Sequence, residues 1–534
     1  MPTLNWIGKE AVVKHHKEVP YRLLESIAEL SVGEPHSGNL IVQGDNLHAL
    51  KALLPRYAGQ VKCIYIDPPY NTGEEGGDGK GWTYNDNVNS PEIKKWLGNT
   101  VGSEGEDLSR HDKWLCMMYP RLLLLKQFLS KDGLIFVSMD ESEIGNLRLM
   151  MEEIFSKSNF LGTFIWKSRR NKDSRHKSNI STDHEYVLCF HGGVGKLKGS
   201  LIDMNKYSCP DNDPRGPWMS DNLVGLATKD RRPNLHYDLV NPDTGINYGC
   251  PEKGWRYSKE TIAKKIIENR IIWPQKSTGR PRHKKFLNEL SSEFTGFSSF
   301  VECGNTNEGT ETVRDILGEN IFMFPKPPSL IKELIFQSTE NNSIILDSFA
   351  GSGTTGHSTL MLNNEDGGNR KFILVEMDNN IARNVTAVRL NRVINGYKKQ
   401  NGDMAKALGG DFQFCKLSDE PLFTAEGEIR PDVTFAQLAE FVWFMETGSG
   451  YSGSFGSSPL LGTFEGRAVY LLYNGILKDK SVGGGNVLTA AVLGVLPEHQ
   501  GPKVIYAAAN RLGSPRLTKE QIIFKQTPYA LGES

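Results

Sequence analysis

The stretch Val61-Lys-Cys-Ile-Tyr-Ile-Asp-Pro-Pro-Tyr70 decides the fold. Its first six residues form a short, nearly continuous apolar run, which is typical of a strand covered on both faces in an α/β sheet. The two prolines end this strand, because neither can donate a hydrogen bond to a neighbouring strand and both restrict φ. We therefore expect Asp67 to Tyr70 to form a stiff loop at the carboxyl end of a strand, where open α/β sheets bind ligands.

This loop offers hydrogen-bond acceptors beside an aromatic ring, a combination suited to a planar base with an exocyclic amine. The amine can donate to the carboxylate of Asp67 and the carbonyl of Pro68 while Tyr70 stacks on the ring. Asp67, Pro68, Pro69 and Tyr70 are therefore the candidate catalytic residues. The alternative is an ordinary turn in which Asp67 only caps the backbone, and the tetrapeptide alone does not decide between the two.

The surrounding sequence predicts a doubly wound α/β domain. Residues 39–43 read as a strand and 47–57 as a helix, so Asp45 and Asp67 should lie at equivalent strand ends on one edge of the sheet. Further helices are expected at 17–30, 110–129 and 141–155, further strands at 133–138 and 160–166, and a short helix near Ser90 within the Gly- and Asn-rich segment 71–105.

A second strand-end loop lies about 280 residues downstream. Residues 343–347 read as a strand, 354–362 as a helix and 370–375 as a strand that ends in Glu376. Glycines in such a loop let the backbone approach a nucleoside, and the acid can take the ribose hydroxyls. The spacing of Gly351, Gly353 and Gly356 does not separate a dinucleotide from another adenosine ligand. His357 stands where a P-loop has lysine, which disfavours a nucleoside triphosphate.

The charge is unevenly distributed. Residues 166–290 contain 24 Lys and Arg against 14 Asp and Glu, so they carry +10 while the rest of the chain carries −11. Such asymmetry with interleaved aromatics favours nucleic-acid contact over a solvated basic loop. The candidate DNA-binding residues form two clusters: Lys167, Arg169, Arg170, Lys172 and Arg175, and then Lys276, Arg280, Arg282 and Lys284.

Length and composition indicate a globular protein of two to four domains, since 534 residues exceed one ordinary core. No apolar run approaches a membrane span and no signal-peptide core is present, so we expect a cytoplasmic protein. The seven cysteines are scattered without a Cys-x-x-Cys pair, which predicts reduced thiols and no metal site.

Several motifs together resemble the β-class amino-methyltransferases that act on DNA, and in particular the modification subunit of type III restriction-modification systems. Besides Asp67-Pro68-Pro69-Tyr70 and Phe349-Ala350-Gly351-Ser352-Gly353, they include Gly44-Asp45-Asn46-Leu47, Lys113-Trp114-Leu115, Met118-Tyr119-Pro120-Arg121-Leu122, Val137-Ser138-Met139-Asp140, His184-Glu185-Tyr186 and Phe324-Pro325-Lys326-Pro327. The resemblance covers most of residues 39–400.

The resemblance implies S-adenosylmethionine as cofactor and adenine N6 in double-stranded DNA as target. It implies that Glu376 holds the ribose, that Asp45 lies at the adenine and that Asp347 orients the glycine loop or the methionine amine. The other cofactor-binding residues that it implies are Lys326, Phe349, Ala350, Gly351, Ser352, Gly353 and Thr354. Cytosine N4 or RNA as substrate, or a non-catalytic DNA-recognition subunit, are the alternatives.

The expected fold is a Rossmann-like methyltransferase sheet with an inserted target-recognition domain and a smaller C-terminal α/β domain. The predicted boundaries are 1–38 for an N-terminal extension, 39–165 and 319–400 for the two parts of the catalytic domain, 166–318 for the insertion and 401–534 for an interaction or assembly domain. The family also implies a homodimer and a helicase-nuclease restriction subunit on a separate chain.

Overall fold

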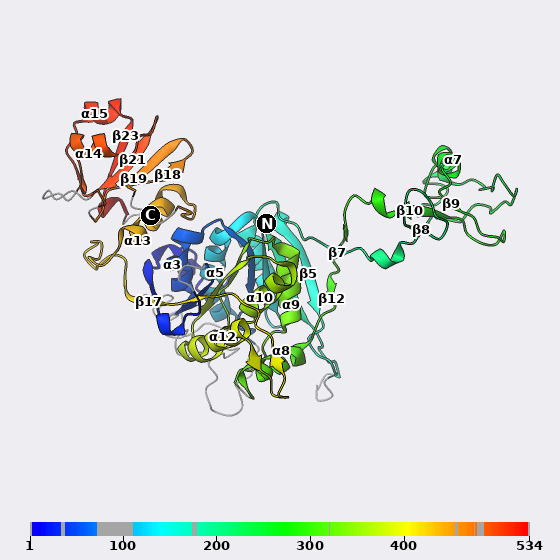
Figure 1. Cartoon of the computed structure of the whole chain (residues 1–534), viewed down its shortest axis with the longest axis horizontal. Coiled ribbons are helices and arrows are strands. Elements are labelled where there is room, and N and C mark those ends of the chain that lie inside the picture. Colours follow the sequence, from blue (N-terminus) through cyan, green and yellow to red (C-terminus); the bar gives the residue numbers. More distant parts are fainter. Residues whose placement is uncertain are drawn as a thin grey trace. The chain divides into compact units, whose positions relative to one another are not determined.

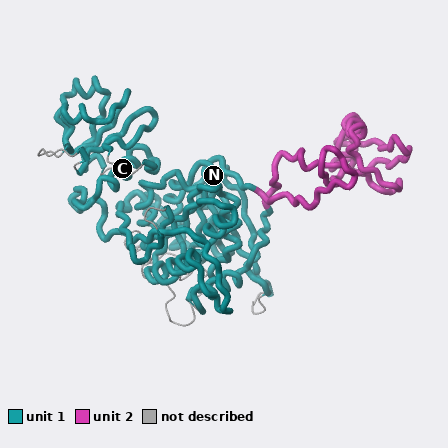
Figure 2. The backbone as a smooth tube through the Cα atoms, viewed as in Figure 1, with its two compact units in different colours: residues 1–198, 298–534 teal, residues 199–297 magenta. Residues whose placement is uncertain are grey.

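The computed structural model describes residues 3–33, 38–71, 110–172, 179–319, 321–453, 458–474, 476–477 and 485–531. These residues fall into two units, which Figure 2 shows in different colours. Unit 1 comprises residues 1–198 and 298–534, and unit 2 comprises residues 199–297. The short helix predicted near Ser90 lies outside the described residues.

Unit 1 is built on a ten-stranded sheet (Figure 1). In spatial order its strands are β1 (Arg22–Ser26), β17 (Gln413–Pro421), β2 (Leu40–Gln43), β14 (Lys371–Glu376), β13 (Ile344–Asp347), β3 (Val61–Ile66), β4 (Leu129–Met139), β6 (Glu185–His191), β5 (Phe160–Trp166) and β12 (Phe300–Val301). The six strands from β17 to β4 are mutually parallel. This arrangement confirms the predicted α/β class.

Helices cover both faces of the sheet. The first layer consists of α3 (Asn46–Tyr57), α5 (Arg110–Phe128) and α6 (Ile144–Phe155), and the second of α8 (Thr306–Leu317), α9 (Pro328–Ser338), α10 (Thr354–Asp366) and α12 (Ala387–Asn395). Successive side chains of a strand point to opposite faces of the sheet. In β2, Val42 therefore packs in the core under the first helix layer and Ile41 in the core under the second.

The strand order explains where a ligand can bind. From β3 the chain continues through α5 to β4 on one side, and from β13 it continues through α10 to β14 on the other. β3 and β13 are neighbours, paired through Ile345 with Cys63 and Leu346 with Ile64. Loops that leave adjacent strands in opposite directions open a crevice at their carboxyl ends, which is the switch point of such sheets.

The helix predicted over residues 17–30 is wrong. The chain instead forms α1 (Lys9–Val12), α2 (His15–Glu18), strand β1 and a single 3₁₀ turn at Ala28–Leu30. β1 pairs antiparallel with β17, for example Leu24 with Leu417. A pairing between segments almost 400 residues apart overrides the local periodicity.

Unit 2 contains a three-stranded antiparallel sheet of β8 (Trp218–Asn222), β10 (Arg282–Phe286) and β9 (Ile271–Ile272), with helix α7 (Lys259–Ile267). Its ends are joined by β7 (Ser200–Leu201) and β11 (Phe294–Thr295). A small core surrounds the buried Trp255. Unit 2 spans fewer residues than the insertion predicted over 166–318, because β6 and β12 pair within the main sheet.

A separate four-stranded sheet follows β17. Its order is β18 (Leu460–Phe464), β19 (Arg467–Leu471), β21 (Lys503–Ala507) and β23 (Ile522–Gln526), with helices α13 (Phe435–Thr447), α14 (Ala490–Val495) and α15 (Ser514–Lys519). Thr434 and Gln437 form a capping box that starts α13. Further short elements include α11 (Asn379–Ile381), the π-helix Ala382–Thr386 that follows it, and two strand pairs: β15 (Tyr397–Lys398) with β16 (Met404–Ala405), and β20 (Val487–Leu488) with β22 (Ala509–Asn510). None of the helices in the described ranges is long and apolar enough to span a bilayer.

Candidate functional site

Four carboxylates lie at one edge of the parallel sheet. Asp45 follows β2, Glu376 ends β14, Asp347 ends β13 and Asp67 follows β3. Because these strands are contiguous and parallel, their carboxyl ends open onto the same edge. Two of these carboxylates are paired with cations, Asp67 with Lys326 and Asp45 with Arg121.

The loop Asp67 to Tyr70 is fixed by contacts from two other elements. The indole Nε1 of Trp114 on α5 donates to the Pro69 carbonyl at 2.7 Å, and the Tyr70 hydroxyl donates to Glu185 of β6 at 2.8 Å. The next residue, Asn71, is buried and donates to Glu143. Among the described residues, the Asp67 carboxylate accepts hydrogen bonds from the Lys326 ammonium and none from a backbone N–H.

Lys326 connects this loop to the glycine loop after β13. Its Nζ donates to the two carboxylate oxygens of Asp67 at 2.8 and 2.7 Å, and it lies 3.4 Å from Glu185. Burial lowers the pKa of Lys326, but the two carboxylates more than offset this and raise its pKa above the ordinary value, so it is charged. The Thr354 hydroxyl donates to the Lys326 carbonyl at 3.2 Å.

Glu376 fixes the glycine loop. Its buried carboxylate accepts hydrogen bonds from the backbone N–H of Gly351 and Asp378, both at 2.8 Å. Gly351 and Gly353 have φ of 51° and 78°, a region that favours glycine. A Cβ at Gly351 would lie 3.1 Å from the ring of Phe322. The loop therefore needs glycine at these positions.

Arg389 of α12 fixes the same loop through hydrogen bonds to two of its residues. It is fully buried and donates to the carbonyl and hydroxyl oxygens of Ser352 and to the hydroxyl of Thr354. His357 lies beside it, and burial lowers the pKa of His357 well below 6.5, so this imidazole is neutral. The residue at the P-loop lysine position is therefore neutral, and the guanidinium of Arg389 contacts it at 3.2 Å.

Asp347 lies at the base of the glycine loop. It is buried and accepts hydrogen bonds from Phe349 N–H at 3.0 Å and the Thr355 hydroxyl at 2.5 Å. Burial raises the pKa of Asp347 to about 7. Phe349 and Ala350 are also buried, and the buried Ser348 hydroxyl has no hydrogen-bond partner among the described residues.

Replacing Asp347 by Asn should flatten the pH dependence of stability. The folded protein binds a proton at Asp347 more tightly than the unfolded chain does, so this contribution is complete below about pH 4 and is lost as pH rises through about 7. Denaturant unfolding of the wild type should lose on the order of 1–3 kcal/mol between pH 5 and pH 8 that the Asn variant retains. An equal loss in both proteins would contradict this assignment.

Asp45 has a structural role in this conformation. Its side chain caps α3 by accepting from the N–H of Leu47 and His48, and Arg121 donates to it at 3.2 Å. The neighbouring Asn46 donates to the Ser348 carbonyl at 3.2 Å, which joins the loops after β2 and β13. The sequence did not single out these contacts, although the motif containing Arg121 belongs to the resemblance.

The predicted basic residues differ in availability. Lys167, Arg169, Arg170 and Lys172 are exposed and follow β5, at the same sheet edge as Asp67; Arg175 lies outside the described residues. In unit 2, Lys276, Arg280 and Arg282 are exposed. Lys284 is only 5% exposed and is paired with Asp211 and Asp213, so it is unavailable to a phosphate. The exposed basic residues that the two predicted clusters omitted include Lys229, Arg231 and Arg232.

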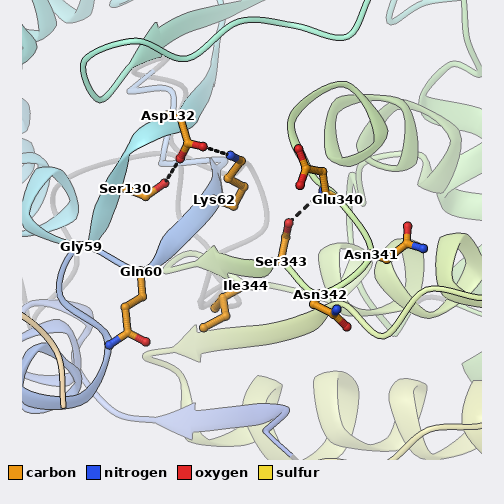
Figure 3. Close-up of a pocket in the computed structure, with 10 residues that line it drawn as sticks. All are labelled: Gly59, Gln60, Lys62, Ser130, Asp132, Glu340, Asn341, Asn342, Ser343 and Ile344. Atoms are coloured by element: carbon orange, nitrogen blue, oxygen red, sulfur yellow. Dashed lines mark hydrogen bonds and ion pairs between the residues drawn. The ribbon is translucent and has the colours of Figure 1, made fainter. Parts of the chain in front are cut away.

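A cavity of about 590 Å³ lies at the opposite edge of the sheet, at the amino ends of β3 and β13 (Figure 3). Four of its polar side chains are engaged in contacts within the lining: Lys62 pairs with Asp132, Ser130 donates to Asp132, and Ser343 accepts from the N–H of Glu340. No cluster of three or more His, Cys, Asp or Glu in the described ranges could hold a metal ion.

Several known proteins are similar in sequence to this chain over the region that contains the site. A family model described as DNA methylase matches residues 61–387. The type III restriction-modification enzyme StyLTI Mod subunit of Salmonella typhimurium is 31% identical, over 72% of this chain and 59% of that protein. The EcoP15I Mod subunit of Escherichia coli is 28% identical, over 70% and 64%.

A type II methyltransferase is also similar. M.KpnI of Klebsiella pneumoniae is 31% identical, and the match covers 67% of this chain and 85% of that protein. In contrast, the chain spans only about 60% of the length of the two Mod subunits.

Proposed function

The chain belongs to the DNA methylase family, and on that premise we propose that it transfers a methyl group from S-adenosylmethionine to the N6 amine of adenine in duplex DNA. The observation that carries the proposal is the position of Lys326. Its ammonium contacts Asp67, and its carbonyl accepts from Thr354 at the end of the glycine loop. The acceptor loop for a base and the loop for a nucleoside cofactor therefore lie side by side, on the neighbouring strands β3 and β13.

The residues present fit S-adenosylmethionine. Positive φ at Gly351 and Gly353 brings backbone close to a ligand, and the Glu376 carboxylate is suited to ribose hydroxyls. When bound, this cofactor supplies an electrophilic methyl group. Phe349 to Thr354, with Asp45, Asp347 and Lys326, form the remainder of the proposed binding wall.

The acceptor loop would hold and orient the base. An adenine flipped out of the duplex, at a cost of a few kcal/mol, can stack on Tyr70 while its amine donates to Asp67 and to the carbonyl of Pro68. No hydrogen bond from a described residue reaches that carbonyl. Rate enhancement then comes from positioning and from fixed acceptors, without a covalent enzyme intermediate.

The experiment is transfer of tritiated methyl groups from S-adenosylmethionine to DNA from a host without adenine methylation, followed by mass analysis of the nucleosides. N6-methyladenine supports the proposal. N4-methylcytosine identifies the alternative substrate, and labelling of RNA alone does the same for RNA. No transfer at all identifies a non-catalytic DNA-recognition subunit. Sequencing the methylated DNA gives the recognition site.

Removing the charges of Arg169 and Arg170 by replacement with Gln should weaken DNA binding and flatten its salt dependence. If both contact phosphates, the slope of log K against log [salt] should fall by about 1.8. The matched control replaces Lys131 and Lys157, two exposed lysines at the opposite, amino-terminal edge of β4 and β5. An unchanged slope in the Arg169 and Arg170 variant, measured by fluorescence anisotropy, would reject this surface.

We further propose a cytoplasmic homodimer that acts with a restriction subunit on a separate chain, because two of the relatives are Mod subunits of type III restriction-modification enzymes. The sheet from β18 to β23, which follows the methylase region, is the candidate for assembly contacts. Sedimentation of the full chain tests whether it is a dimer. Sedimentation of a variant with substitutions on the surface of that sheet tests whether the sheet makes the dimer contacts.

A further inference from the structure

We infer that, before a base binds, the Lys326 ammonium occupies the place of the target amine on Asp67. An entering base then displaces this ammonium from Asp67 to Glu185. The inference rests on the proposed function and deepens it, because it assigns Lys326 a positioning role in base entry rather than a place in the cofactor wall alone.

The ammonium of Lys326 occupies both features that a base would use. It donates to both oxygens of Asp67, at 2.8 and 2.7 Å, where the amine is expected to donate. It also lies 4.8 Å from the centre of the Tyr70 ring, the surface on which the base is expected to stack. A base cannot take these positions while the ammonium remains there.

A second carboxylate is already in place to receive the ammonium. Glu185 lies 3.4 Å from Lys326 Nζ and accepts a hydrogen bond from the Tyr70 hydroxyl. The backbone of Lys326 is held by its neighbours Pro325 and Pro327 and by the hydrogen bond from Thr354. The flexible four-carbon side chain can therefore move the charge between the carboxylates while the backbone stays fixed.

The chemistry of the transfer step explains why the ammonium must move. The lone pair of the amine nitrogen forms the new N–C bond, the C–S bond breaks with its electrons left on sulfur as a thioether, and the amine is positively charged until it releases a proton to water. Asp67 stabilises this charge, whereas an ammonium on the same carboxylate would oppose it. Moving Lys326 to Glu185 leaves both cations paired.

The test compares Glu185→Gln, Lys326→Met and the double variant in steady-state methylation of DNA. Gln keeps an acceptor for the Tyr70 hydroxyl but cannot balance the ammonium, so the E185Q protein should lose at least tenfold in kcat/KM for DNA, mostly through KM. Adding Lys326→Met to E185Q should raise kcat/KM at least fivefold, because nothing then competes for Asp67. Glu141→Gln, an exposed carboxylate that contacts Tyr186, is the matched control.

Affinity for S-adenosylmethionine, measured by equilibrium dialysis, provides the readout that separates positioning from structure. It should stay within threefold in the Glu185→Gln protein, and a larger loss there would overturn the inference. Because Lys326 also belongs to the proposed cofactor wall, the double variant and E185Q are compared at saturating S-adenosylmethionine. A double variant less active than E185Q would also overturn it and leave the proposed function standing. A wild-type protein that methylates nothing would overturn both.

Discussion

Replacing Asp67 by Ala should lower methyl transfer to DNA by roughly a thousandfold or more while leaving affinity for S-adenosylmethionine nearly unchanged. The substitution removes the charged acceptor for the target amine, and Glu185 remains 3.4 Å from Lys326 to balance its charge. The cofactor should still bind, because the carboxylate and backbone contacts of the glycine loop come from Glu376 and Asp347. Tritium transfer and calorimetric titration of the cofactor measure the two effects separately.

The control for this substitution is Asp132→Ala, which removes a carboxylate at the opposite edge of the same sheet, where it pairs with Lys62. That protein should transfer methyl groups at close to the wild-type rate. Retained transfer by the Asp67 variant would exclude this loop as the base-holding element. Loss of cofactor affinity in the Asp67 variant would instead show that the acceptor loop also shapes the cofactor site.

Replacing Glu376 by Ala should reduce affinity for S-adenosylmethionine by about a hundredfold or more. The substitution removes the proposed ribose acceptor and leaves the buried N–H of Gly351 and the partly buried N–H of Asp378 without their partner. An unsatisfied buried donor costs about 1–3 kcal/mol, and the glycine loop would shift to satisfy these two. Glu376→Gln keeps one acceptor oxygen and should lose less.

Glu365→Gln is the matched control, since Glu365 pairs with Lys332 on the surface at the far end of α10. Its cofactor affinity should equal that of the wild type. Wild-type affinity in the Glu376→Ala protein would show that this carboxylate neither contacts the ribose nor is needed to hold the glycine loop for the cofactor.

The central strands of the unit 1 sheet could be predicted because the sequence features that mark them lie within each strand. The apolar run before Asp67 and the run before Phe349 each mark a buried strand, and parallel pairing brings their ends to one edge. The N-terminal segment was predicted wrongly because β1 exists only by pairing with β17. β1 is an edge strand whose residues are at most partly buried, so its sequence lacks the apolar run that marks the central strands.

The individual contacts of the site were beyond prediction for a related reason. Lys326 and Asp67 are 259 positions apart, and Tyr70 and Glu185 are 115 apart. The motifs that contain them could be identified, but which side chains meet depends on strand order. Lys284 illustrates the same limit for charge: composition counts it as basic, whereas Asp211 and Asp213 neutralise it.

The short antiparallel pair β7 and β11 has a consequence for how such proteins can diversify. Leu201 faces Phe294 and Ser200 faces Thr295, so the chain enters and leaves unit 2 at adjacent points. A different segment with equally close ends should therefore fit between the same two strands without altering the spacing of β3 and β13. On the proposal that unit 2 reads the DNA sequence and that the loops after β3 and β13 carry out methyl transfer, recognition and chemistry would then be able to evolve independently.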